Sequence, residues 1–197
     1  AQSMAGGGGA SPNATRTTLD PIPPEGGWDG LAKLLEAAKP GVDTRLAPSP
    51  SQVTGRIEML LNRGDTDEAL ALIEKREAEI KDQRGTDVQL MFQHARALAA
   101  LNRTNEAIDI YTDMTTRFPE LPEPWNNLAA LYASRGELEK AQDALQMALR
   151  ADPGYAAARA NLGDLQLLQA LQTYKKAASD GVPGMQDKAR EVETMLK

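Results

Sequence analysis

The middle of the chain repeats with a period of 34 residues, and this period restricts the folds open to it. Residues 88–121 align with residues 122–155 without a gap. The matched positions are Ala95 with Ala129, Leu98 with Tyr132, Asn102 with Gly136, Ala107 with Ala141, Tyr111 with Leu145, Met114 with Ala148, and Pro119 with Pro153. A fixed period of this length is typical of solenoids, in which one supersecondary unit stacks on the next.

Each block has the apolar spacing of two helices joined by a short turn. In the second block, Trp125, Leu128 and Tyr132 fall on one helical stripe, and Arg135-Gly136-Glu137 supplies the turn. A second stripe follows, made by Leu138, Ala141, Leu145 and Ala148. Small residues recur where paired helices must approach most closely, which indicates a packing requirement.

The second block resembles the tetratricopeptide repeat (TPR). The residues that carry the resemblance are Trp125, Leu128, Ala129, Tyr132, Gly136, Ala141, Leu145, Ala148 and Pro153, with Ala129 in place of the usual small Gly. The resemblance implies an all-α, right-handed superhelix of antiparallel helix pairs. It also implies that the first helix of each pair lines a concave groove.

Further units extend the solenoid over residues 50–197. A weaker unit at about 50–83 carries Gly64, Ala69 and Ile73, and four extra residues follow it. The units at 88–121 and 122–155 are then followed by an abridged unit at 156–179 and a cap at 184–197.

The abridged unit lacks the turn of its predecessors. Ala170 follows Gly163 after seven residues instead of twelve, and no helix breaker lies between Leu165 and Ala178. We therefore expect one fused helix over about 155–179, with Leu167, Leu171, Tyr174 and Ala178 on one face. After 180–184, a last helix offers Met185, Ala189, Val192 and Leu196 as a terminal cap. Alternatively, the long helix leaves a stripe exposed for dimerisation.

Residues 1–49 have the composition of a flexible Gly- and Pro-rich arm. A short amphipathic helix is predicted near 28–39, where Trp28, Leu31 and Leu34 have helical spacing. This helix either caps the first repeat or serves as an arm that docks on a partner or on the chain itself. Because the sequence begins at Ala1, we expect either a processed chain without its signal peptide or residues left by an expression tag.

The composition offers little for catalysis. The chain has no cysteine and one histidine, His94, which is expected to pack with one edge in water. No converging set of acid, base and nucleophile is visible, and no metal or cofactor motif appears, so we predict a protein that is not an enzyme and needs no cofactor. A net charge of −6 in mixed signs disfavours nucleic acid, and no apolar run is long enough for membrane insertion.

Three primary amides recur at one height of the predicted groove. Gln93, Asn127 and Asn161 are spaced 34 residues apart, and such amides can hold an extended peptide backbone. The other predicted groove residues are Phe92, Arg96, Asn126, Ala130 and Asp164. Amides at this position can also bridge local structure, and that alternative is left open. A clamp for a C-terminal carboxylate is disfavoured because its positions hold Thr54, Glu58 and Ala157.

The sequence thus predicts a scaffold or adaptor that holds an extended segment of a client protein. The alternative is a structural or oligomerisation module that acts through its terminal helices, with a homodimer as one form. The wider pattern is similar to exported proteobacterial TPR proteins, so a periplasmic location is slightly favoured over the cytoplasm, and envelope assembly is one role that it suggests.

Overall fold

The computed structural model describes residues 49–197. The predicted helix near 28–39, and all of the N-terminal arm except Ser49, lie outside this range.

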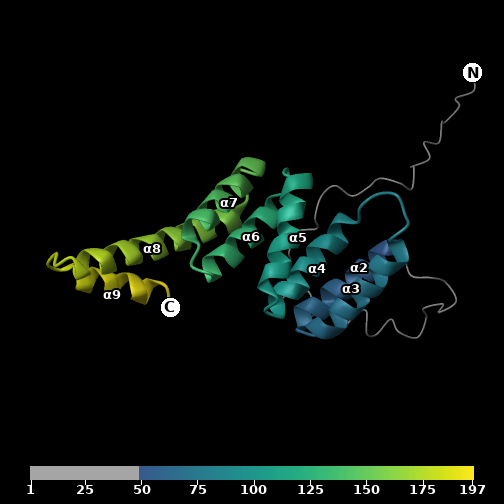
Figure 1. Ribbon diagram of the computed structural model, residues 1–197, viewed down its shortest axis with the longest axis horizontal. Helices are drawn as coiled ribbons and strands as arrows, with labels where there is room; N and C mark the ends of the chain where they lie inside the picture. Colours follow the sequence, from purple (N-terminus) through teal and green to yellow (C-terminus); the bar gives the residue numbers. More distant parts are fainter. Residues whose placement is uncertain (1–48) are drawn as a thin grey trace, which may run out of the picture.

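The part of the chain from 49 to 197 consists of eight α-helices and contains no strand (Figure 1). In chain order they are α2 (Pro50–Arg63), α3 (Thr66–Ile80), α4 (Val88–Ala100), α5 (Thr104–Arg117), α6 (Pro122–Ser134), α7 (Leu138–Ala151), α8 (Ala156–Ser179) and α9 (Met185–Met195). Helix pairs α2–α3, α4–α5 and α6–α7 are the three regular units.

Local signals explain where the first helices begin and how each pair turns. Ser49 caps α2 in a capping box with Gln52, and the side chain of Asp87 accepts from Leu90 N at 3.0 Å to cap α4. The turn within each pair needs one left-handed residue, which is Gly64, Asn102 or Gly136 with φ of 81°, 59° or 76°. The repeat therefore keeps the turn conformation even where asparagine replaces glycine.

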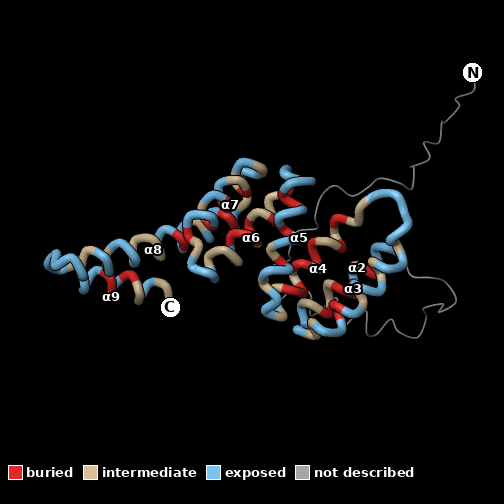
Figure 2. Tube along the Cα trace, in the orientation of Figure 1, coloured by how far each residue is buried: buried red, intermediate tan, exposed pale blue. Residues whose placement is uncertain are grey.

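Each helix from α2 to α8 packs against the next helix along the chain. The first helices of neighbouring units also pack against each other in two places, α2 against α4 and α6 against α8. The buried residues follow the interior of this stack (Figure 2). Ala107 and Ala141 are fully buried at equivalent positions of α5 and α7, as close helix packing requires. The fold is an all-α, TPR-like superhelix, which confirms the predicted fold class.

The fused helix is also confirmed. Helix α8 runs unbroken for 24 residues, and a turn at Asp180 leads into α9. Helix α9 packs on α8, and no comparable packing joins it to α6 or α7. It therefore caps the far half of the long helix, and the α8–α9 hairpin projects from the stacked repeats (Figure 1).

Candidate peptide-binding groove

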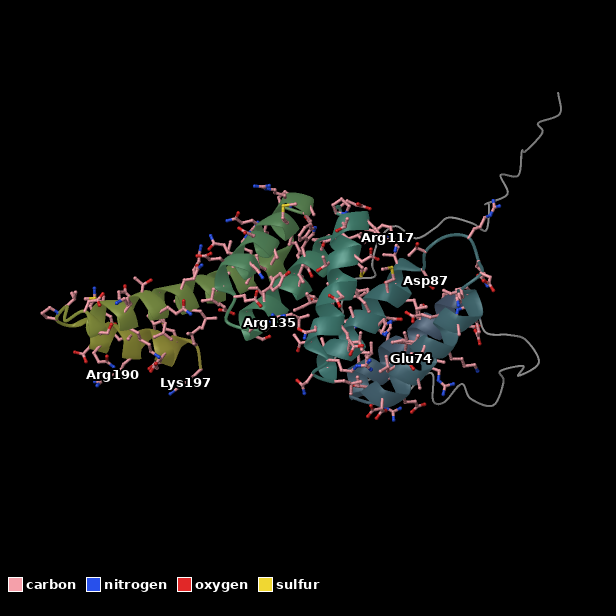
Figure 3. The ribbon with its side chains drawn as sticks, viewed as in Figure 1. Glu74, Asp87, Arg117, Arg135, Arg190 and Lys197 are labelled. Carbon is pink, nitrogen blue, oxygen red and sulfur yellow. The ribbon has the colours of Figure 1, made fainter. Side chains whose placement is uncertain are left out.

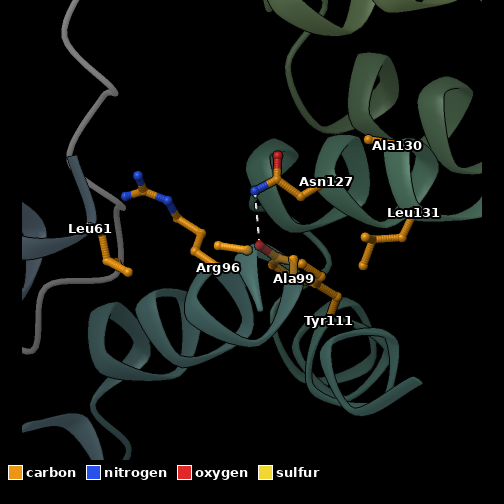
Figure 4. Close-up of a pocket in the computed structure, with 8 residues that line it drawn as sticks. Leu61, Arg96, Ala99, Tyr111, Asn127, Ala130 and Leu131 are labelled. Carbon is orange, nitrogen blue, oxygen red and sulfur yellow. Dashed lines mark hydrogen bonds between the residues drawn. The ribbon is translucent and has the colours of Figure 1, made fainter. Parts of the chain in front are cut away.

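A pocket of about 250 Å³ opens on the side of the first helices, between α4 and α6 (Figure 4). Its lining comes from four helices and consists of Leu61, Arg96, Ala99, Ala100, Tyr111, Asn127, Ala130 and Leu131. Helices α4 and α6 lack the close packing that joins α2 to α4 and α6 to α8. The pocket thus occupies the one loosened step between neighbouring first helices of the described solenoid.

The ninth residue of each unit explains why a pocket is open between α4 and α6. Glu58, Arg96, Ala130 and Asp164 are the ninth residues of their units, in α2, α4, α6 and α8. Arg96 reaches back to Glu58 and closes the gap between α2 and α4. Ala130 has no long side chain to extend toward α4, so the next gap remains as a pocket.

Arg96 brings little net charge to this pocket. Its Nη1 donates to both carboxylate oxygens of Glu58 at 2.8 Å, and Nη2 donates to Asn62 Oδ1 at 3.3 Å. Both members of the ion pair are largely buried. Because the carboxylate neutralises the guanidinium at contact distance, the pocket is suited to apolar and neutral polar groups more than to an anion.

Tyr111 forms the floor of the pocket together with Asn127. The tyrosine is 1% exposed, and its ring meets the edge of the Phe92 ring at a centroid distance of 5.9 Å. Asn127 Nδ2 donates to the Tyr111 hydroxyl at 3.0 Å (Figure 4). Burial raises the pKa of Tyr111 to about 12, although the hydrogen bond from Asn127 opposes this shift.

This pKa predicts a loss of stability at alkaline pH. In the unfolded chain the phenol ionises near pH 10, whereas in the folded chain it stays neutral until about pH 12. The contribution is therefore complete below pH 10 and disappears as the pH rises through 12, with a loss of roughly 2–3 kcal/mol. Urea unfolding between pH 9 and 12 should show a steeper decline for the wild type than for Tyr111→Phe. Parallel curves for the two proteins would contradict the assignment.

The three amides bridge neighbouring helices in the structure. Gln93 Nε2 donates to the Thr54 carbonyl oxygen at 2.8 Å, and Asn161 Nδ2 donates to Asn126 Oδ1 at 2.8 Å. Asn127 is engaged with Tyr111. This geometry matches the alternative in which such amides hold local structure together, because each one joins two helices of the stack.

Three of the predicted groove residues are too buried to contact a ligand. Phe92 is 2% exposed in the core, Gln93 is 1% exposed, and Asn126 is also buried. The prediction that Phe92 faces the groove is wrong, because it lies one turn from the core residues Val88 and Ala95 on the same side of α4.

The remaining predicted residues fall into two groups. Arg96, Asn127 and Ala130 line the pocket. Asn161 and Asp164 are exposed on α8 and do not line it. The prediction missed Leu61, Ala99 and Leu131, which supply apolar walls from the last turns of three first helices. Leu61 and Ala99 are both the twelfth residue of their units, so the repeat alignment contains a signal for these two, whereas Leu131 is the tenth residue of its unit.

The comparison with known families supports the same architecture. Residues 98–162 match the family model described as tetratricopeptide repeat, a stretch that runs from the end of α4 into α8. Together with the all-helical packing, this match supports a TPR protein. Repeats of this kind generally mediate contacts between proteins. No curated protein matches the chain.

Between residues 49 and 197, no group of three or more His, Cys, Asp or Glu side chains is arranged to hold a metal ion. In the same range, no helix has both the length and the apolar character of a membrane span.

Proposed function

We propose that this protein is a non-catalytic interaction scaffold that holds an extended segment of a client protein along the first helices. The observation that carries the proposal is the pocket between α4 and α6, where apolar walls surround a few polar groups. A peptide side chain can enter the pocket while its backbone runs along the groove.

The lining suggests the chemistry of the client. Asn127 uses one N–H on Tyr111, so its second N–H is free to donate to a client carbonyl. The walls accept a medium-sized apolar side chain, and the Arg96–Glu58 pair leaves little attraction for an acidic tail. A short peptide held in this way should bind in the micromolar range, or roughly 8 kcal/mol.

A finer form of the proposal places the chain in envelope assembly, with a client that is itself exported. The resemblance to exported proteobacterial TPR proteins favours this form. Fractionation of the native host, with detection of the chain in the periplasmic fraction, would test the location independently of any client.

Filling the pocket should abolish client capture. The exposed Ala130 projects into the pocket, so Ala130→Phe would occupy the space of the client side chain and weaken binding at least tenfold. A pull-down from a proteobacterial envelope extract, read by mass spectrometry, would find the client. Calorimetry with the identified client segment would then give the dissociation constant for each variant.

The control is Ala71→Phe, which makes the same substitution at an exposed position of α3, away from the pocket lining. It should bind like the wild type. Asn127→Ala should weaken binding, whereas Asn161→Ala should have little direct effect because Asn161 does not line the pocket. Equal binding by the wild type and Ala130→Phe would move the function away from the groove, to the terminal helices.

A further inference from the structure

The α8–α9 hairpin has a thinner core than the repeats. Helix α8 has 24 residues, but only Ala158 and Leu165 are buried, and both lie in its first half. In the far half, Gln169 is bonded to Gln142 of α7, and the contacts beyond it are made mainly with α9. Figure 2 shows this end of the molecule mostly as half-buried and exposed chain. A hairpin of two helices buries its own apolar faces only in part, which leaves this end of the molecule suited to contact with a further partner.

One side of the hairpin gathers apolar residues that are partly exposed. At about 100° per residue, Leu167, Ala170, Tyr174 and Ala177 fall within a stripe roughly 80° wide, and all four are half-buried. On α9, Met195 is 70% exposed. Lys188 lies about 20° from Met195 around the same helix, and its Nζ sits over the Tyr174 ring at 5.6 Å. Met195 and the stripe therefore share one side, which we call the hairpin face.

An ion pair joins α8 and α9 on the other side of the hairpin. Lys175 Nζ and Glu193 Oε1 form an ion pair at 2.5 Å between α8 and α9. Lys175 is turned about 100° from Tyr174, and Glu193 is turned about 140° from Lys188. The ion pair thus lies away from the hairpin face, so the apolar opening is on one side only.

We propose that a second copy of this chain covers the hairpin face, so that two α8–α9 hairpins form an antiparallel four-helix bundle about a two-fold axis. Such bundles are a common way for helical hairpins to bury their apolar sides. Val182 and Met195 are the two exposed large apolar residues of the described chain. They lie at opposite ends of the hairpin, and the antiparallel arrangement brings Val182 of each copy toward Met195 of the other.

The charge of the hairpin favours a second copy as the occupant. Residues 175–197 carry five basic and four acidic side chains, whereas the whole chain has a net charge of −6. Arg190 and Lys197 lie at the C-terminal end of the chain (Figure 3), and the acidic residues of the same segment are Asp180, Asp187, Glu191 and Glu193. Two hairpins therefore meet without net repulsion, and the antiparallel arrangement holds the acidic repeats at opposite ends of the dimer.

The size of the hairpin predicts a weak dimer. Helix α9 has 11 residues, a length of about 17 Å. Two helices of this length side by side give an interface at the lower end of the range for specific dimers. We expect a dissociation constant of about 10–100 μM.

Sedimentation equilibrium of the full chain between 5 and 500 μM tests the proposal without any client. The wild type should approach twice its mass of 21.2 kDa as the concentration rises. Met195→Glu should weaken the dimer at least tenfold, because it places a charge in the apolar contact. Gln146→Glu, an equal change of charge at an exposed position of α7, should leave it unchanged. A monomer at every concentration, or a dimer that Met195→Glu does not weaken, would overturn the proposal.

Cysteine cross-linking tests the antiparallel arrangement. The chain has no cysteine of its own, so Val182→Cys and Met195→Cys each introduce a single thiol. A mixture of the two variants should form the mixed disulfide faster than either variant forms a disulfide with itself. Faster self-linking of either variant would overturn the antiparallel bundle. Because neither residue lines the groove pocket, the outcome is independent of the proposed client site.

Discussion

Replacing Tyr111 with alanine is expected to lower the free energy of unfolding by about 3–5 kcal/mol, the range typical of large aromatic deletions in cores. The ring is 1% exposed and packs edge-on against Phe92, so its removal leaves a cavity beneath α4. In a solenoid, stability depends on contacts between neighbouring units. Tyr111 belongs to the core cluster that joins α4 and α5 to Leu128 of α6, so the loss also weakens the junction between these two units. Equilibrium unfolding in urea measures the effect.

Tyr111→Phe is the matched control because it keeps the ring and removes the hydroxyl. Asn127 then loses its acceptor, but it is only half-buried and water can replace the bond. The expected loss is about 1 kcal/mol. If the phenylalanine variant were as unstable as the alanine variant, the hydroxyl and not the packed ring would be the main source of stability.

The repeat architecture could be predicted from sequence because its causes are local. Ala107 and Ala141 must be small where paired helices approach, and both are fully buried. The turn at Asn102 and Gly136 needs a left-handed residue, and asparagine and glycine adopt that conformation most readily. These requirements recur in every unit, so the 34-residue period is visible without knowledge of the partner.

The long helix could also be predicted from a local cause, which is the absence of helix-breaking residues. No residue between Leu165 and Ala178 breaks a helix, and α8 runs from Ala156 to Ser179, within one residue of the expected bounds. Its relation to the rest of the fold was harder to predict. The way in which α9 covers only α8 depends on packing between distant surfaces, which periodicity does not encode.

The candidate site was predicted less well because repeat position alone does not determine exposure. Gln93 was expected in the groove, but α2 brings the Thr54 carbonyl within 2.8 Å of it and buries it. The pocket itself arises from a difference between units. Ala130 is short where Arg96 is long, and the consequence appears only when the facing helix is known.

The three amides Gln93, Asn127 and Asn161 do not form a continuous ladder of groups available to a client. Asn127 is the one member of the ladder that lines the pocket, since Gln93 is buried and Asn161 is bonded to Asn126. A client should therefore be gripped at one loosened step of the solenoid rather than evenly along it. Specificity would then come from one apolar side chain and the bonds beside it.

Breaking α8 in its middle is expected to separate the hairpin from the repeats. In Gln169→Pro, the ring removes the backbone hydrogen bond of residue 169 and clashes with the carbonyl of Leu165, at a cost of about 3 kcal/mol or more. The substitution also removes the bond from Gln169 Nε2 to Gln142 Oε1, 2.7 Å long, which ties α8 to α7. Hydrogen exchange should show lost protection in α8 and α9, while α2 to α7 keep theirs. The proposed dimer should weaken as well.

Ala156→Pro is the matched control, because it places proline at the first position of the same helix. Pro122 occupies the equivalent position of α6, 34 residues earlier, and Pro50 begins α2. Tyr155 is already extended, with φ −70° and ψ 95°, as the residue before proline requires. We expect this variant to be neutral or stabilised by about 0.4–1 kcal/mol. If both proline variants lost protection in α8 equally, the long helix would be sensitive to proline anywhere, and the junction near Gln169 would have no special part in holding the hairpin.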